Sequence, residues 1–488
     1  MTDATAVTRQ GTLRGRTEDG IAAFLGVPYA AAPFGPRRFA APKAAEPWTG
    51  ERDATAYGPT APKAPYAPPF DALIPETSQD GPDCLNLNIW TPEPGPGARL
   101  PVMVWLHGGS FSNGSANSSG YRGDTFARDG VVFVGVNYRL GVDGFLHLPG
   151  APDNRGLLDM IAALEWVRDN IAAFGGDPDR VTVFGESAGA VAIGRLLVDP
   201  AARGLFRRAV LQSGACHHFV RPDTARRIGE RTAERLGVAH TAEAFAAVPL
   251  PELVAAQNAL SEEFRRRPDP AVWGDAALNG MVFEPVAEDG TPPGPGAGAG
   301  VDPGVDLLVG SNREENRLYM VPTGRFTTIS EGRVRRGADA FGADLAGYRA
   351  SRPGASPGEL LDAIVTDWFW RIPAVRLAEA VPGSYLYEFA WRSPQFGGEL
   401  GACHALELGF VFDRVDDPDY VALAGKDAPE ELARAMHGAW VEFAATGDPG
   451  WGAYDPAGER ATMVFDAGDC RVEADPRAAE RGLWEGVR

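Results

Sequence analysis

The stretch that decides the fold reads VTVFGESAGAVAIGRLLV, residues 181–198. Val181–Phe184 has the pattern of a buried β-strand, and Ala190–Val198 can continue as a helix. Between them stands GESAG, Gly185–Gly189. A G-x-S-x-G sequence between a strand and a helix is typical of a nucleophile elbow, a sharp turn that presents a serine hydroxyl and needs small residues around it. The segment therefore predicts that Ser187 is a catalytic nucleophile rather than part of an ordinary tight turn.

The surrounding sequence places this turn in a parallel sheet. Short β-rich runs alternate with helical patterns, and Gly156–Phe174 repeats its apolar residues at helical spacing. The order strand, helix, strand predicts an α/β fold with crossover connections. The runs that we expect to form strands are Asn86–Thr91, Val102–His107, Val131–Asn137, Val181–Phe184 and Arg208–Gln212.

The domain organisation follows from the second half of the chain. Residues 221–375 are richer in helical patterns, and Ala428–Thr446 predicts one more amphipathic helix. The Gly, Pro and Ala-rich segment Asp289–Gly304 could be an interdomain linker, but the apolar run Val305–Gly310 that follows predicts another strand of the sheet. We therefore expect one domain over residues 1–488, with helical excursions at about 221–375 that form a cap.

Composition excludes several classes of protein. Hydrophobic residues make up 44% and charged residues 23% of the 488, which excludes wholesale disorder. The net charge of −19 disfavours a nucleic-acid or membrane partner. The start of the sequence shows no secretory signal, and no apolar run is long enough to span a membrane. The cysteines are far apart, so we expect no zinc or disulfide framework and a cytoplasmic location with reduced thiols.

A second motif predicts an oxyanion hole. VMVWLHGGSF, residues 102–111, ends an apolar strand with two glycines. Acyl transfer develops negative charge on the former carbonyl oxygen, and backbone N–H groups that converge on it stabilise that charge. We expect the donors to be Gly109, Ser110 and Ala188, and we expect His107 to be structural because the base should come later in the chain.

Motifs in a fixed order along most of the chain carry a resemblance. The sequence resembles the type B carboxylesterase family of α/β-hydrolases, in particular its bacterial p-nitrobenzyl-esterase-like branch. The resemblance implies a large mixed, mostly parallel sheet flanked by helices. The motifs are Phe24–Phe39 (FLGVPYAAAPFGPRRF), Asp83–Trp90 (DCLNLNIW), Asn137–Leu146 (NYRLGVDGFL), Phe174–Ala190 (FGGDPDRVTVFGESAGA), Leu211–Ala215 (LQSGA) and Ala439–Trp451 (AWVEFAATGDPGW).

The family pattern also implies the partners of Ser187. It places the acid at Glu315 in GSNREEN and the base at His404 in CHALELGFVF. His404 would take the serine proton and return it to the leaving alcohol, while Glu315 would fix the imidazole tautomer. Glu314 is the alternative acid, because adjacent extended residues point to opposite sides and only one can face His404. The family spacing favours Glu315 as the acid. We expect the reaction to need no metal or organic cofactor.

The sequence departs from the family pattern at an early disulfide. The family's early disulfide would join Cys84 to a cysteine near Pro59–Pro65, where this sequence has PTAPKAP. The expected reaction is cleavage of small, uncharged carboxylic esters through an acyl-enzyme. Amides, carbamates or thioesters are alternative substrates, and a non-catalytic, neuroligin-like binding protein is the alternative from another class. The sequence carries no pattern from which the oligomeric state can be read.

Overall fold

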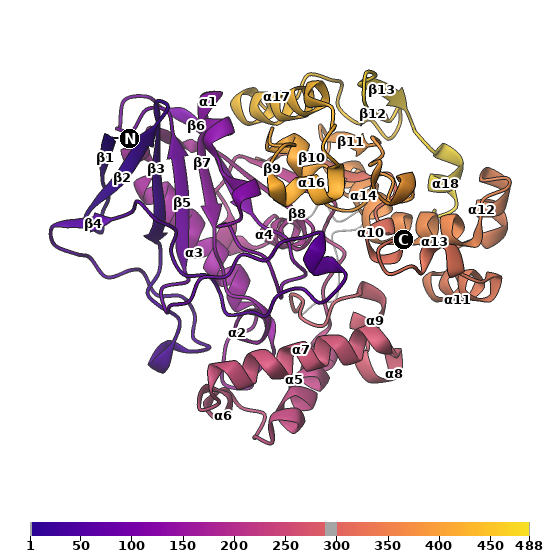
Figure 1. Ribbon diagram of the computed structural model, residues 1–488, viewed down its shortest axis with the longest axis horizontal. Helices are drawn as coiled ribbons and strands as arrows, with labels where there is room; N and C mark the ends of the chain where they lie inside the picture. The colour runs from indigo at the N-terminus through magenta and orange to yellow at the C-terminus, as the bar shows by residue number, and fades with distance from the viewer. Residues whose placement is uncertain (1, 288–299, 488) are drawn as a thin grey trace. The chain divides into compact units, whose positions relative to one another are not determined.

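The computed structural model describes residues 2–287 and 300–487, which form two compact units. Unit 1 comprises Met1–Tyr66, Glu76–Arg208 and His218–Pro292, and unit 2 comprises Ala67–Pro75, Ala209–His217 and Pro293–Arg488. The ribbon in Figure 1 is coloured along the chain, so the segments of each unit can be followed there. Each unit contains strands of the predicted sheet with helices around them.

Unit 1 holds the N-terminal strands in the order β1-β2-β3-β5-β7-β6-β8, with β4 beside β2. The strands from β1 to β7 pair antiparallel along this path, whereas β7, β6 and β8 are parallel. Strands β6 and β7 are almost entirely buried, as their unbroken apolar sequences predict. The bounds are β1 (Thr2–Val7), β2 (Thr12–Glu18), β3 (Ile21–Pro28), β4 (Glu51–Asp53), β5 (Asn86–Thr91), β6 (Leu100–Leu106), β7 (Val132–Val136) and β8 (Gly176–Glu186).

The helices of unit 1 fall into two groups. The first group includes α3 and α4, which contact β8. The second, α5 to α9, lies below the strands in the view of Figure 1, where α5 packs against α7. The bounds are α1 (Asp124–Arg128), α2 (Gly141–Phe145), α3 (Arg155–Asn170), α4 (Ala188–Leu196), α5 (Pro222–Leu236), α6 (Ala242–Ala246), α7 (Leu250–Arg266), α8 (Pro270–Trp273) and α9 (Ala276–Asn279).

Unit 2 carries the strands in the order β9-β10-β11-β12-β13. Strands β10, β11 and β12 are parallel, and β13 returns antiparallel to β12. The bounds are β9 (Arg208–Gln212), β10 (Asp306–Asn312), β11 (Tyr385–Phe389), β12 (Ala461–Phe465), β13 (Arg471–Ala474), α10 (Arg317–Met320), α11 (Glu331–Phe341), α12 (Leu345–Ser351), α13 (Pro357–Thr366), the π-helical turn η8 (Asp367–Arg371), α14 (Ile372–Ala380), α15 (Leu408–Val411), α16 (Pro418–Ala424), α17 (Glu430–Thr446) and α18 (Ala478–Gly482).

Most predicted elements are confirmed, and several differ by one or a few residues at their ends. The predicted strand at Val181–Phe184 begins earlier, because Gly176 already pairs with Leu100 of β6. The predicted helix Gly156–Phe174 is α-helical only to Asn170 and closes with a tighter 3₁₀ turn, η4 (Ile171–Phe174). Of the predicted loop Asp289–Gly304, residues 289–299 lie outside the described residues.

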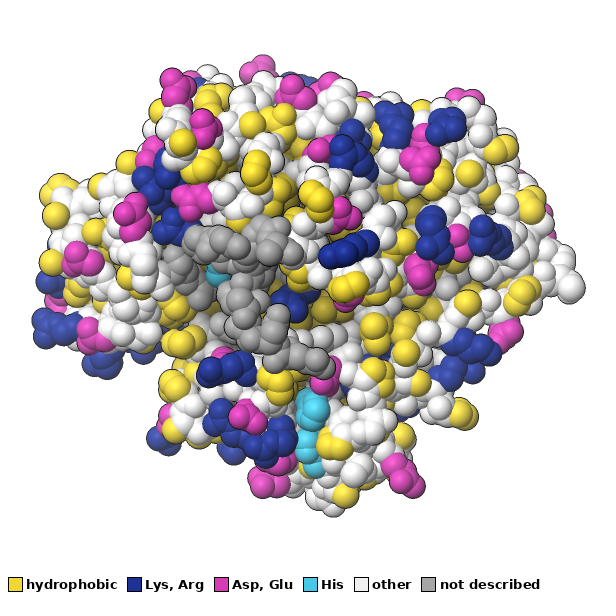
Figure 2. Space-filling model, turned by 180° about the vertical axis from the view of Figure 1, so that it is seen from behind, with side chains coloured by type: hydrophobic (Ala, Val, Ile, Leu, Met, Phe, Trp, Pro, Cys, Tyr) yellow, Lys and Arg dark blue, Asp and Glu magenta, His cyan; other side chains and the backbone are white. Residues whose placement is uncertain are grey.

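The surface mixes the two signs of charge. Over the face in Figure 2, Lys and Arg side chains lie among Asp and Glu side chains. On α5, for example, Arg231 and Arg235 both pair with Glu263 of α7. Among the described residues, no helix is long and apolar enough to cross a membrane.

Candidate active site

Ser187 lies at a strained turn between β8 and α4. Its backbone angles are φ 53° and ψ −121°, a region that residues with a side chain rarely adopt. Such strain persists only where the surroundings fix it, and it gathers at functional sites. Here the carbonyl of Ser187 accepts the first hydrogen bond of α4, from the Val191 N–H at 2.9 Å. Ser187 as a whole is half-buried, so the elbow is not sealed inside the core.

Close packing explains the glycine that follows the serine. A Cβ on Gly189 would stand 1.9 Å from the carbonyl oxygen of Leu106 and 3.0 Å from that of His107. Only glycine therefore allows the start of α4 to approach the end of β6. Since Leu106 is also the register partner of Gly185, the elbow and the segment after β6 lie side by side.

The segment after β6 forms a loop of unusual backbone conformation beside the serine. A Cβ on Gly108 would lie 3.2 Å from the Cβ of Ser187. The next residues all have positive φ, 115° at Gly109, 52° at Ser110 and 56° at Phe111. Phe111 is buried, and its carbonyl accepts a hydrogen bond from the Gly141 N–H at 2.6 Å. The structure thus brings Gly108–Phe111 next to the elbow that contains Ser187 and Ala188.

His107 lies in this region but is held as a neutral, packed side chain. Burial lowers its pKa to about 3. Its ring stacks on Tyr138 at a centroid distance of 4.4 Å, and the Tyr138 hydroxyl donates to the His107 carbonyl at 2.6 Å. An imidazole with such a low pKa is a poor general base near neutrality, which agrees with the structural role expected from its position in the sequence.

In unit 2, Glu315 and His404 form a buried pair. The carboxylate Oε2 of Glu315 lies 2.7 Å from His404 Nδ1, and both side chains are at most 5% exposed. The other oxygen of Glu315 accepts a hydrogen bond from the Asn312 N–H at 2.8 Å. A carboxylate held in this way favours a proton on Nδ1 and leaves Nε2 as the basic nitrogen.

Glu314 points to a different set of partners. Its carboxylate pairs with Arg317 at 2.8 Å and with Arg392, and it accepts a hydrogen bond from the Ala402 N–H at 2.9 Å. These contacts commit Glu314 to an arginine cluster. Of the two adjacent glutamates, Glu315 is therefore the one that faces the imidazole.

Aromatic side chains surround His404. The ring of Trp370 lies 5.2 Å and that of Tyr319 5.8 Å from the imidazole, and these two rings stack on one another at 6.2 Å. Trp370 belongs to η8, and a π-helical turn inserts an extra residue that changes the direction of the side chains after it. The turn supplies an apolar wall beside His404.

The sequence analysis missed a third carboxylate behind the pair. Glu407 is fully buried and accepts hydrogen bonds from Asn312 Nδ2 at 2.6 Å and Gln212 Nε2 at 3.2 Å. Asn312 thereby links Glu407 to Glu315, to which it donates through its backbone. Burial, and then the neighbouring Glu315, raise the pKa of Glu407 to about 7, while the bond from Asn312 opposes the rise. The sequence signal that could have indicated Glu407 is its position three residues after His404.

Replacement of Glu407 by glutamine is expected to change the pH dependence of stability. A folded pKa of about 7 exceeds the ordinary value of about 4.3, so the folded state holds this proton more tightly. The stabilisation is complete below about pH 4 and is lost as the pH rises through about 7, a loss on the order of 3 kcal/mol. Glutamine mimics the neutral acid, so Glu407→Gln is expected to flatten the decline in the free energy of unfolding between pH 5.5 and 8, measured by urea titration.

The matched control for this prediction is Glu165→Gln on α3, where the carboxyl is exposed. It should keep the pH dependence of the wild type. Equal slopes in the wild type and in Glu407→Gln would contradict the assignment of the titrating group.

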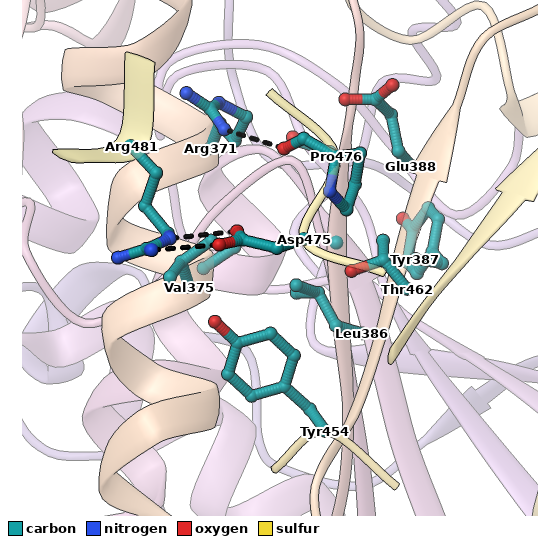
Figure 3. A pocket seen from close by; sticks show the side chains of 13 residues that line it. Arg371, Val375, Leu386, Tyr387, Glu388, Tyr454, Thr462, Asp475, Pro476 and Arg481 are labelled. Atoms are coloured by element: carbon teal, nitrogen blue, oxygen red, sulfur yellow. Dashed lines mark hydrogen bonds and ion pairs between the residues drawn. The ribbon is translucent and has the colours of Figure 1, made fainter. Parts of the chain in front are cut away.

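The pocket in Figure 3 belongs to a different part of unit 2. It is lined from β10, β11, β12, η8, α14 and the segment around α18, and none of the predicted site residues is among the described residues that line it. Two of its charged side chains pair with one another, since Nε and Nη2 of Arg481 donate to the two oxygens of Asp475, each at 2.8 Å. We assign this pocket no part in the reaction.

Comparison with known proteins decides the family. The model of the carboxylesterase family matches residues 2–341. The chain belongs to the carboxylesterase family. This confirms the resemblance seen in the sequence.

Relatives cover almost the whole length of this carboxylesterase-family member. It is 37% identical to the para-nitrobenzyl esterase of Bacillus subtilis (strain 168), over 99% of this chain and 98% of that protein. It is 36% identical to the phenmedipham hydrolase of Pseudarthrobacter oxydans, over 92% and 91% of the two chains. A solved carboxylesterase structure from Geobacillus stearothermophilus superposes with a TM-score of 0.84 at 35% identity, over 98% of this chain and 99% of that one.

These comparisons confirm the predicted α/β-hydrolase fold, a large mixed and mostly parallel sheet flanked by helices. They also establish the protein as a carboxylic-ester hydrolase. The residues that carry the reaction, and the arrangement of Ser187 relative to His404, stay predictions.

Proposed function

We propose that this enzyme cleaves small carboxylic esters through an acyl-enzyme on Ser187. His404 acts as the general base and acid, Glu315 orients it, and the N–H groups of Gly109, Ser110 and Ala188 bind the oxyanion. The observation that carries the proposal is the buried hydrogen bond of 2.7 Å between Glu315 Oε2 and His404 Nδ1. The strained elbow at Ser187 supports the role of the nucleophile.

The proposed reaction has two balanced halves. The Ser187 Oγ bonds to the ester carbonyl carbon while its proton passes to His404 Nε2, and this proton then goes to the alkoxy oxygen as the C–O bond breaks. In the second half, water attacks the acyl carbon and gives a proton to His404, which returns it to the Ser187 Oγ as the bond between this oxygen and the acyl carbon breaks and the acid leaves. The backbone N–H groups stabilise the negative charge on the carbonyl oxygen in both halves.

The same proposal includes the wider setting of the enzyme. Residues 1–488 serve as one catalytic domain, in which the helical excursions at about 221–375 cap the site and select uncharged substrates of moderate size. A buried thiol at Cys84 without a disulfide supports a cytoplasmic location.

A panel of p-nitrophenyl esters with acetyl, butyryl, octanoyl and succinyl groups tests the substrate class. We expect turnover of the short, uncharged esters and a fall of at least about tenfold in kcat/KM for the charged succinyl ester, because the aromatic wall beside His404 does not solvate a carboxylate. The matched butyryl p-nitroanilide and a butyryl thioester separate amide and thioester cleavage from ester cleavage. A folded protein that turns over none of these substrates and resists a fluorophosphonate would favour a binding protein.

A further inference from the structure

The loop beside Ser187 needs an external support. Ser110 and Phe111 are both in the left-handed region, at φ 52° and 56°, where residues with a side chain are strained. Two adjacent strained residues will relax unless the neighbouring structure fixes both ends of the loop. One end is the buried strand β6, and the other is the turn at Asn113 and Gly114.

This turn is held by the carboxylate of Glu76. Asn113 Nδ2 donates to Glu76 Oε2 at 2.7 Å and to the carbonyl of Ala64 at 2.8 Å. The Gly114 N–H donates to Glu76 Oε1 at 3.3 Å. Asn113 in turn donates its own N–H to the carbonyl of Gly109 at 2.9 Å. A continuous chain of contacts therefore runs from Glu76 to one of the proposed oxyanion donors.

The charge of Glu76 is balanced by a buried lysine. Lys63 Nζ lies 3.5 Å from Glu76 Oε1, and the two side chains are 0% and 5% exposed. Among the described residues, Lys63 has no other ion-pair partner. Burial lowers the pKa of Lys63 and raises that of Glu76, and each charge limits the shift of the other. Removing one partner would leave a buried charge uncompensated, which is more damaging than removing both.

The stretch that carries Lys63 is itself fixed by polar contacts. The carbonyl of Gly58 accepts from Asn117 Nδ2 at 2.8 Å, and that of Pro59 accepts from Asn86 Nδ2 at 2.7 Å. The Thr60 N–H donates to the carbonyl of Gln79 at 2.9 Å. This is the stretch in which the family resemblance placed a cysteine. In this chain the stretch is connected to the loop beside Ser187 by the ion pair between Lys63 and Glu76.

We propose that the buried Lys63–Glu76 ion pair positions the oxyanion loop, residues 108–114, for the reaction. Lys63 keeps Glu76 ionised, and the ionised carboxylate accepts hydrogen bonds from Asn113 and Gly114 together. These contacts keep the N–H groups of Gly109 and Ser110 aimed at one point. The inference rests on the proposed function, because those donors matter only if Ser187 attacks an ester.

The test replaces Lys63 by methionine, which has a similar shape and no charge. Misdirected oxyanion donors weaken transition-state binding and leave ground-state binding unchanged. We expect kcat for p-nitrophenyl butyrate to fall by about 10- to 100-fold, with KM within about twofold of the wild type. Affinity for a trifluoromethyl ketone, which forms a tetrahedral oxyanion adduct, is expected to fall by the same factor as kcat/KM. The double variant Lys63→Met/Glu76→Gln is expected to recover part of the loss.

Two control variants separate this positioning role from a loss of stability. Lys43→Met makes the same substitution in an exposed ion pair with Glu46 and should leave kcat unchanged. Thr91→Val removes a buried hydrogen bond to the Phe174 carbonyl and should lower stability without lowering the affinity for the ketone relative to KM. Should Lys63→Met fail to fold, Asn113→Ala removes the contact to Glu76 at the loop and carries the same expectation.

The outcomes distinguish this inference from the proposed function. If the wild type hydrolyses esters and both Lys63→Met and Asn113→Ala retain its kcat and ketone affinity, the ion pair has no positioning role. The same fall in kcat and ketone affinity in Thr91→Val, with KM unchanged, would equally overturn it. An inactive wild type that a fluorophosphonate does not label would instead refute the proposed function.

Discussion

Replacement of Ser187 by alanine is expected to lower kcat/KM for p-nitrophenyl butyrate by about 10⁴- to 10⁶-fold. Without the hydroxyl no acyl-enzyme can form, and only substrate binding and the oxyanion donors continue to contribute. Alanine has the same backbone preferences as serine at φ 53°, so the elbow keeps its conformation and the free energy of unfolding should change little. Steady-state kinetics and urea unfolding measure the two effects separately.

The control for this prediction is another serine-to-alanine exchange. Ser330 caps α11 through its hydroxyl, which accepts a hydrogen bond from the Arg333 N–H at 3.3 Å. Ser330→Ala should keep full activity and lose only about 1 kcal/mol of stability. Activity of Ser187→Ala within about tenfold of the wild type would exclude Ser187 as the nucleophile, because a residue that forms the covalent intermediate cannot be dispensable.

The second large effect is expected from Glu315→Gln, which should reduce kcat by about 10²- to 10⁴-fold. A glutamine amide can present an N–H to His404 Nδ1 and so favour the tautomer that carries its proton on Nε2, where the serine proton must be accepted. The imidazolium that forms during the reaction also loses its counter-charge. The kcat at saturating ester is the relevant measurement.

Glu314→Gln is the matched comparison, since it makes the same change one residue earlier. It should keep kcat within about threefold, and it should cost a few kcal/mol of stability because Arg317 is buried and loses a charged partner. If Glu314→Gln is the crippled variant and Glu315→Gln is not, the acid has been assigned to the wrong residue.

Sequence patterns predicted the position of the buried strands well. Strands β5 and β9 have the predicted bounds, since both are buried on the two faces of a sheet and end where polar or turn-forming residues begin. The π-helical turn at Asp367–Arg371 could not be predicted in this way. Its residues continue a helical pattern from α13 into α14, and one inserted residue leaves no distinct signal in the sequence.

The two halves of the site differ in how far local sequence predicts them. The elbow at Ser187 and the glycines after β6 are short motifs, and the small residues that their backbone conformations require are neighbours in the sequence. The Glu315–His404 pair joins residues 89 positions apart, and only the family resemblance selected these two. Lys63, Glu76 and Glu407 were missed, because a charged residue in a sequence indicates a solvated surface unless its buried partner is known.

The most direct test of the proposed mechanism is to locate the covalent adduct of a fluorophosphonate on the wild-type enzyme. We expect tandem mass spectrometry of the digested protein to find one phosphonyl group per chain, on the Ser187 hydroxyl, and we expect His404→Ala to slow its formation by at least about 100-fold. An enzyme that turns over p-nitrophenyl butyrate while its adduct lies on a residue other than Ser187 would contradict the account.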